Sequence, residues 1–134
     1  MLPDFEFHHI GVAVFDIGNC APLYTGAGYT GTDIVYDPVQ NVRICFLEKE
    51  GMPRIELVEP HDGKSPVTNI LKKNGAGPYH VCYTVKDIDD SISRLRKMGF
   101  VPVTRPVGAV AMGGRRICFL FNKNTGLVEL VEKK

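Results

Sequence analysis

Two histidines and two glutamates stand at matching places in two similar parts of the chain. His9 precedes the apolar run IGVAV and His80 precedes VCYTV, whereas Glu56 interrupts RIELV and Glu129 interrupts LVELV. A charged carboxylate among Ile, Leu and Val is costly unless it is paired or coordinates a metal. Two imidazoles and two carboxylates form a mixed nitrogen and oxygen donor set that suits a divalent transition metal. The four residues therefore predict a metal site with positions left open for water or substrate.

An internal repeat relates these four residues to one another. HHIGVAVFDI at 8–17 matches YHVCYTVKDI at 79–88, at an offset of 71 residues. RICFL at 43–47 recurs at 116–120, and IELVE at 55–59 recurs as VELVE at 128–132, both at an offset of 73. Matched blocks in the same order indicate a duplicated module. We expect a single domain over 1–134, with modules at about 5–60 and 76–134 and a linker helix at about 61–75.

The repeat also selects between two adjacent histidines. His8 has no counterpart in the second module, where Tyr79 stands, so His9 is the predicted ligand. Each of the four residues taken alone would be read as structural. In particular, strand alternation places Glu56 and Val58 on one side of the chain but does not establish that this side is buried.

Each module follows the order β-α-β-β-β. In the second module we expect a strand at 80–85, a helix at 89–98 capped by Asp89 or Asp90, and strands at 101–106, 115–122 and 126–132. The matching stretches of the first module are 9–14, 18–29, 32–37, 42–50 and 54–60, and its helix tolerates Pro22 only near the first turn. The expected fold is α+β, with the two βαβββ modules forming a curved eight-stranded mixed sheet around a metal-binding cavity.

Composition excludes several classes of partner. Sixteen basic and fifteen acidic residues give a formal charge of +1, which does not favour binding to nucleic acid. The 134 residues contain no apolar run of membrane-spanning length and no secretory signal at the start, so we expect a cytoplasmic protein without membrane insertion. Cys20, Cys45, Cys82 and Cys118 form no CxxC pair and are expected to be reduced core residues.

The repeat and its four predicted ligands resemble the vicinal oxygen chelate superfamily, in which paired βαβββ modules hold a metal. Residue by residue, the ligand positions of the superfamily correspond to His9, Glu56, His80 and Glu129. Glyoxalase I and methylmalonyl-CoA epimerase share this set. The linker SPVTNILKKNGAGPYHVCY is similar to that of the epimerase family, and it also predicts a helix with Ser65 as N-cap, Pro66 in the first turn, and Ile70 and Leu71 buried.

The resemblance implies proton transfer next to a metal. A divalent ion, whether cobalt, nickel, zinc, manganese or iron, would chelate a thioester substrate while a carboxylate removes the α-proton. Glu129 is the expected acid/base. The epimerase family has a second catalytic glutamate where this chain has Val39, within DPVQN, so we predict Asp37 as its substitute.

The resemblance also extends to substrate and assembly. The expected substrate is a CoA thioester or a glutathione adduct, bound by Ser65, Gln40, Arg115 and Arg116, and the expected assembly is a homodimer. Arg115 and Arg116 follow Gly113-Gly114 in a loop that is longer than its epimerase counterpart and lacks the usual histidine.

Three alternative functions remain open at this point. The chain could be a lactoylglutathione lyase of the glyoxalase I kind, a metal-free protein that sequesters antibiotics or other small molecules, or an oxygen-activating iron enzyme. The presence of all four ligands favours a metal-dependent isomerase or lyase. A metal-free binding protein has no use for a glutamate in the last strand of both modules.

Overall fold

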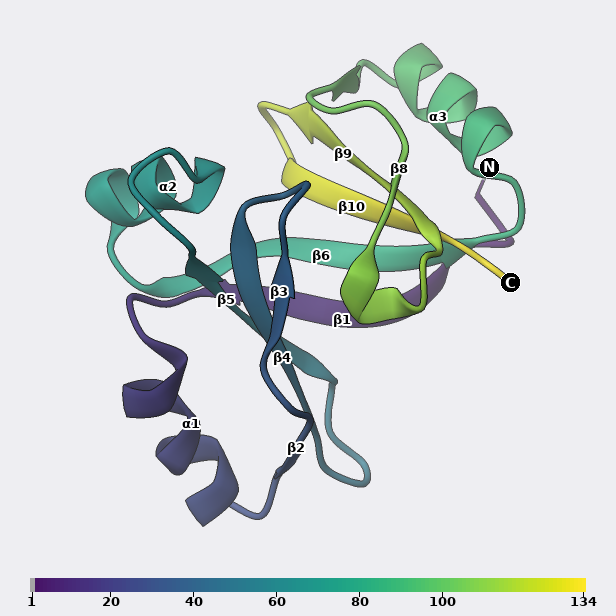
Figure 1. The fold of residues 1–134 in the computed structure, drawn as a ribbon. Coiled ribbons are helices and arrows are strands. Elements are labelled where there is room, and N and C mark those ends of the chain that lie inside the picture. Colours follow the sequence, from purple (N-terminus) through teal and green to yellow (C-terminus); the bar gives the residue numbers. More distant parts are fainter. Residues whose placement is uncertain (1) are drawn as a thin grey trace. The chain divides into compact units, whose positions relative to one another are not determined.

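The computed structural model describes residues 2–134, which divide into two compact units. The first unit comprises residues 9–79, and the second comprises residues 80–134 together with the N-terminal residues 2–8. Figure 1 shows the elements along the chain. Within residues 2–134, every helix is too short or too polar to span a membrane.

The first unit is built around β5 (Ile55–Pro60). This strand runs parallel to β1 (Glu6–Ala13) and antiparallel to β4 (Val42–Glu48), with which β2 (Thr30–Gly31) and β3 (Val35–Asp37) also pair. Helix α1 (Ile17–Gly26) covers one face of these strands, and α2 (Pro66–Asn74) follows β5. The core between α1 and the sheet consists of Val12, Val14, Ile17, Cys45, Leu47 and Leu57.

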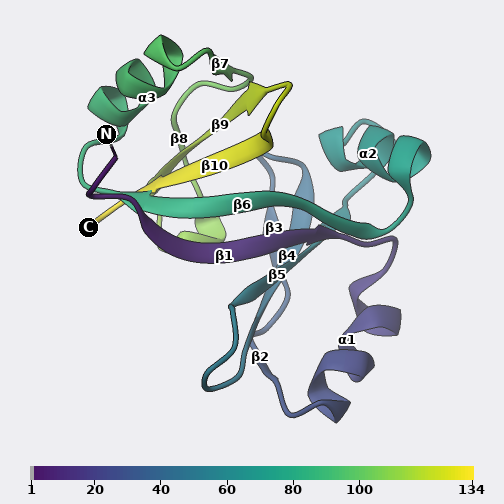
Figure 2. The ribbon, with the colours of Figure 1, turned by 180° about the vertical axis from the view of Figure 1, so that it is seen from behind.

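The second unit repeats this arrangement around β10 (Gly126–Glu132). That strand runs parallel to β6 (Gly77–Val85) and antiparallel to β9 (Arg116–Asn122), with which β7 (Val101–Pro102) and β8 (Val107–Gly108) pair. A short 3-10 turn, Val110–Met112, lies between β8 and β9. Helix α3 (Ile88–Lys97), seen from behind in Figure 2, packs on a core of Val85, Ile88, Leu95, Phe100, Cys118, Leu120, Val128 and Leu130.

The predicted α+β class and βαβββ order are confirmed, but the number of strands is wrong. Residues 2–134 contain ten strands instead of eight. Two short strands, β2 at 30–31 and β3 at 35–37, replace the one expected at 32–37, and β7 at 101–102 and β8 at 107–108 replace the one expected at 101–106. A threonine hydroxyl explains both interruptions. The amide of Phe46 donates to Thr32 Oγ1 at 2.9 Å, and that of Phe119 donates to Thr104 Oγ1 at 3.1 Å. A side chain thus replaces a backbone acceptor at equivalent points of the two modules.

Three helix details also differ from the sequence prediction. Helix α3 is capped by Asp87, whose carboxylate accepts from Asp90 N at 3.0 Å, so the cap is neither Asp89 nor Asp90. Helix α1 contains Pro22 in its interior and not in the first turn. In α2 the predicted cap Ser65 is confirmed, but the buried residues are Val67 and Leu71, whereas Ile70 is only half-buried.

The last strand of each module is tied to the start of its helix by a glutamate. Ile17 N, in the first turn of α1, donates to Glu59 Oε1 at 2.8 Å, and Ile88 N, in the first turn of α3, donates to Glu132 Oε2 at 3.0 Å. Arginines from the neighbouring strands, Arg43 and Arg116, hold these carboxylates. Such a carboxylate satisfies an amide that a helix N-terminus leaves without a partner.

We predict that Glu132→Gln lowers the free energy of unfolding at pH 7 by about 1 kcal/mol, because the neutral amide weakens the charged contacts to Arg116 and Ile88 N. Arg116 and the Ile88 amide lower the pKa of Glu132. A lowered pKa stabilises the folded state above the pKa of the unfolded chain, and this stabilisation is lost as the pH falls through the folded value. The difference between the two proteins in urea denaturation should therefore shrink as the pH is lowered past about 4.

Glu6→Gln is the control, since Glu6 is exposed and meets Lys133 only at 3.6 Å. It should change stability by less than about 0.5 kcal/mol. A Glu132→Gln deficit that is as large at pH 3 as at pH 7 would contradict the assigned role of the charge.

Candidate metal-binding site

The first unit holds His9 and Glu56 as a buried pair. Parallel pairing sets Gly11 of β1 opposite Glu56 of β5, so His9, two residues before Gly11, lies on the same face of the sheet. His9 Nε2 lies 3.2 Å from Glu56 Oε1, and the two residues are 0% and 3% exposed. Phe46, opposite Glu56 on β4, meets the His9 ring edge-on with 5.4 Å between centroids. The imidazole is therefore held with Nε2 directed at the carboxylate.

The second unit holds His80 and Glu129 in the same way. Cys82 of β6 lies opposite Glu129 of β10, which places His80 on the same face as the glutamate. His80 Nε2 lies 3.0 Å from Glu129 Oε1, and the residues are 4% and 2% exposed. Phe119 contacts the His80 ring edge-on at 5.1 Å between centroids, as Phe46 contacts His9. The duplication has thus preserved the pair and the aromatic ring that orients it.

Each pair fits half of the donor set of a divalent metal. Nε2 of an imidazole and a carboxylate oxygen are both metal ligands, and each pair directs these two atoms at one another in a buried setting. The burial of Glu56, which strand alternation left open, is established. Two donors are fewer than the four or more that transition metals usually take, so neither pair forms a complete site by itself.

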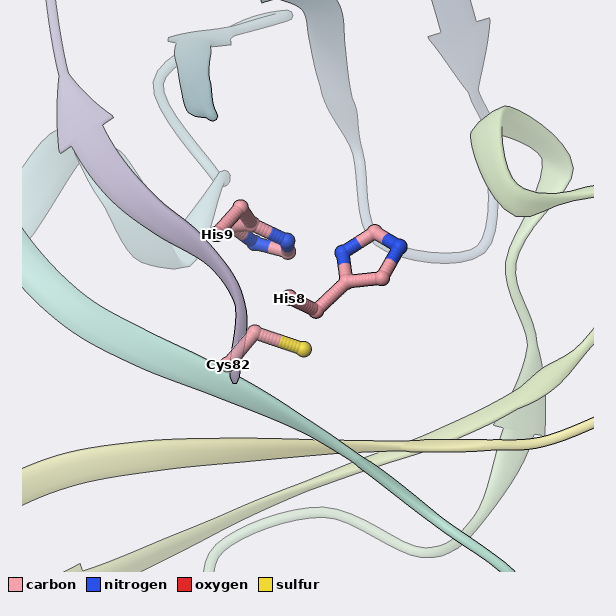
Figure 3. A group of neighbouring side chains, drawn as sticks. All are labelled: His8, His9 and Cys82. Carbon is pink, nitrogen blue, oxygen red and sulfur yellow. The ribbon is translucent and has the colours of Figure 1, made fainter. Parts of the chain in front are cut away.

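His8 occupies a different environment from His9. It is half-buried and belongs to the second unit, where one of its ring nitrogens lies within 4.8 Å of the sulfur of Cys82 (Figure 3). One imidazole and one thiol are too few for a closed structural metal site, and Tyr79 occupies the equivalent repeat position. His8 therefore gains no support as a ligand of the proposed metal.

Asp37 is fully buried and anchors the turn between β3 and β4. Its Oδ1 accepts from Val39 N at 3.0 Å and from Gln40 N at 3.1 Å, and its Oδ2 accepts from Gln40 Nε2 at 2.7 Å. Asp37 lies opposite Val42, and Val42 lies opposite Pro60, so sheet alternation puts Asp37 on the same face of the first unit as Glu56. Val39 is 64% exposed. The catalytic role of Asp37 and the substrate role of Gln40 stay predictions, with the Gln40 amide nitrogen turned toward Asp37.

The other predicted substrate-binding residues make contacts within their own units. Ser65 is buried, and its hydroxyl accepts from Val67 N at 3.3 Å. Arg115 Nε donates to the Glu132 carbonyl at 2.8 Å. Arg116 contacts Glu132 and Asp89 on the helix-covered face, which is opposite to the face that carries Glu129. A substrate role for these three residues stays a prediction, and the position of Arg116 does not favour it.

The cysteines are thiols, as expected from their spacing. Cys45 donates to the Thr32 carbonyl at 3.4 Å and Cys118 to the Thr104 carbonyl at 3.3 Å. Burial raises the pKa of both thiols. A raised pKa disfavours the thiolate that a metal would require, so these two residues act as core side chains.

The family model of the Glyoxalase/Bleomycin resistance protein/Dioxygenase superfamily matches residues 8–119 of the chain. The chain belongs to this superfamily. Mitochondrial methylmalonyl-CoA epimerase of Dictyostelium discoideum is 33% identical to this superfamily member over 135 aligned positions, which cover 96% of this chain and 78% of the relative.

Solved structures of epimerases share the fold of this superfamily member. Methylmalonyl-CoA epimerase of Mycobacterium tuberculosis superposes with a TM-score of 0.83 at 28% identity, covering 96% of this chain and 87% of its own. A variant of the Streptomyces coelicolor epimerase in complex with 2-nitronate-propionyl-CoA gives a TM-score of 0.81 at 27% identity, covering 95% and 96%. The similarity therefore extends over nearly the whole length of each protein.

Sequence reasoning missed the residues that support the predicted ligands. Phe46 and Phe119 orient the imidazoles, and Glu59 and Glu132 hold the helices. All four lie inside the repeated blocks RICFL and ELVE, which served only to align the modules. A phenylalanine or glutamate retained at the same position of both copies was the signal that could have identified them.

We predict that Asp37→Ala lowers the free energy of unfolding by about 2 kcal/mol, because Val39 N and Gln40 N lose their acceptor beside a buried strand end. Urea denaturation measures the effect. Asp33→Ala is the matched control, since Asp33 is exposed, and it should change stability by less than about 0.5 kcal/mol. Equal stability of the two variants would show that the Asp37 turn does not support the fold.

Proposed function

We propose that the protein is a metal-dependent isomerase of the methylmalonyl-CoA epimerase kind, in which His9, Glu56, His80 and Glu129 together hold one divalent ion. The observation that carries this proposal is the pair of buried His–Glu contacts at repeat-equivalent positions. Each pair alone supplies two donors, and the two together supply the four that a catalytic metal with open positions uses.

The proposed substrate is a CoA thioester with an acidic α-proton. Its support is the epimerase activity named for the D. discoideum relative and the CoA analogue bound to the S. coelicolor protein. A bound divalent metal would supply positive charge next to the thioester oxygen, where charge develops as the proton leaves. The homodimer and the cytoplasmic location stay predictions.

Two carboxylates are proposed to move the proton. Glu129 is buried beside His80 and can remove or return a proton on one face of the substrate. Epimerisation also needs a proton donor on the opposite face. Asp37 is our candidate, because it is buried and lies on the face of the first unit that carries Glu56.

A lactoylglutathione lyase-like reaction is the second candidate. Val39, at the position where epimerases have their second catalytic glutamate, favours it, since valine cannot transfer a proton. A reaction in which one carboxylate removes and returns the proton on one face needs only Glu129.

We predict that the purified protein binds one divalent ion per chain. His80→Ala should weaken Mn²⁺ binding by more than roughly 10- to 100-fold, which is the loss typical of a residue that only orients a metal ligand. Isothermal titration calorimetry measures the stoichiometry and affinity. His8→Ala is the control, because His8 is the chain neighbour of a proposed ligand without being one, and it should keep the stoichiometry of the unaltered protein. Absence of divalent binding to the unaltered protein would overturn the metal assignment.

We predict that the metal-loaded protein exchanges the α-proton of methylmalonyl-CoA with D₂O and that Glu129→Gln lowers the exchange rate by at least about 100-fold. NMR follows the α-proton, and a chiral assay follows the configuration. Asp37→Asn should keep exchange but lose epimerisation, since asparagine can still accept from Val39 N and Gln40 N.

The same preparations are assayed with methylglyoxal and glutathione. Turnover there without exchange on methylmalonyl-CoA would replace the epimerase proposal by the lyase alternative. Epimerisation at an unchanged rate in Asp37→Asn would exclude Asp37 as the second acid/base.

A further inference from the structure

Three apolar residues continue across the second unit from the proposed ligand His80. Leu127 of β10 lies opposite His80, Phe121 of β9 lies opposite Leu127, and Val101 of β7 lies opposite Phe121. Directly opposite residues in a sheet project to the same side. Leu127, Phe121 and Val101, which we term the apolar row, therefore share the face of His80 and Glu129.

The apolar row is accessible to solvent. Leu127 is half-buried, Phe121 is 45% exposed and Val101 is 62% exposed. Single exposed apolar residues need no explanation, but here three adjacent ones begin at a buried imidazole. Hydrocarbon that covered them would gain free energy in proportion to the area removed from water.

The first unit provides an internal comparison for the apolar row. The repeat equates Leu127 with Arg54 and Phe121 with Glu48, both at an offset of 73, and Val101 with Thr30 at an offset of 71. Arg54 and Glu48 form an ion pair, and Thr30 lies opposite Glu48. The same three sheet positions are thus polar in one module and apolar in the other.

The two sets of facing positions that come next along these strands do not diverge in this way. Two residues further along the strands, the facing pair Glu56 and Phe46 of the first module corresponds to the identical pair Glu129 and Phe119 of the second. After two more residues, the facing pair Val58 and Ile44 corresponds to the identical pair Val131 and Ile117. The fold therefore tolerates either polar or apolar residues in the row, and stability alone does not account for the apolar set beside His80.

We infer that the apolar row binds a hydrocarbon group, aliphatic or aromatic, carried by the same molecule that binds at the His80–Glu129 pair. The inference rests on the proposed function and assigns the class of substituent on its substrate. It identifies Leu127, Phe121 and Val101 as specificity residues that discriminate among acyl groups by size and polarity.

The test uses malonate, ethylmalonate and butylmalonate as probes of the Mn²⁺-loaded protein, with binding measured by isothermal titration calorimetry. These dicarboxylates differ only in their alkyl group. We expect affinity to rise about threefold for each added methylene, as apolar area is removed from water. The double variant Val101→Thr with Phe121→Gln makes the row polar at two exposed positions, and it should abolish this rise while leaving the affinity for malonate unchanged.

Leu23→Gln is the control, since Leu23 is a 73% exposed apolar residue on α1, outside the row. It should retain the full dependence on alkyl length. Equal affinities for the three probes in the unaltered protein would overturn the inference and leave the proposed function standing. Binding of none of the three probes would also overturn the inference, whereas the metal-binding and exchange assays decide the proposed function. A change of oligomeric state in the double variant, seen by size-exclusion chromatography, would make the row an interface between copies and overturn its role as a substrate site.

Discussion

The burial of a carboxylate and an imidazole among apolar strands is the constraint on which the rest of this structure depends. A buried charge without a partner would cost more than a small domain can tolerate, since its net stability is only about 5–15 kcal/mol. Parallel pairing of the first and last strands of each module provides the partner, because it places a histidine two residues before the position opposite the glutamate. The parallel pairing and the intervening helix are therefore requirements of the site as well as of the fold.

Several features that support the buried His–Glu pair are present in both modules. Both modules keep the His–Glu contact, the phenylalanine against the imidazole, the threonine hydroxyl in the ladder and the glutamate at the helix start. The glutamate at the helix start lies three residues after the buried glutamate on the same strand. Alternation sends the two carboxylates to opposite faces, so one strand serves the site on one side and the helix on the other.

Features shared by the two modules could be predicted from the sequence, whereas strand interruptions and the choice of helix cap could not. Strand periodicity and the two offsets predicted the βαβββ order and selected His9, Glu56, His80 and Glu129 as one group of candidate ligands. The direct contacts of His9 with Glu56 and of His80 with Glu129 are findings of the structure. The same patterns could not predict that Thr32 and Thr104 divide a strand, because a hydroxyl replacing a backbone acceptor leaves no periodic trace. Nor could they separate Asp87 from Asp89 and Asp90 as the cap, since three nearby aspartates are equally suited by type.

The threonine interruptions have a consequence for association of the chain. β2 and β7 are the outermost strands of the two units on the side away from β5 and β10, and each has only two residues before the ladder is broken. A long, flat, apolar edge would be a template for adding strands from other molecules. Val101 and Val103 supply the apolar character, but the broken ladder denies an incoming strand a continuous run of donors and acceptors. The protein can thus display valines beside the proposed substrate site without offering them as a nucleus for aggregation.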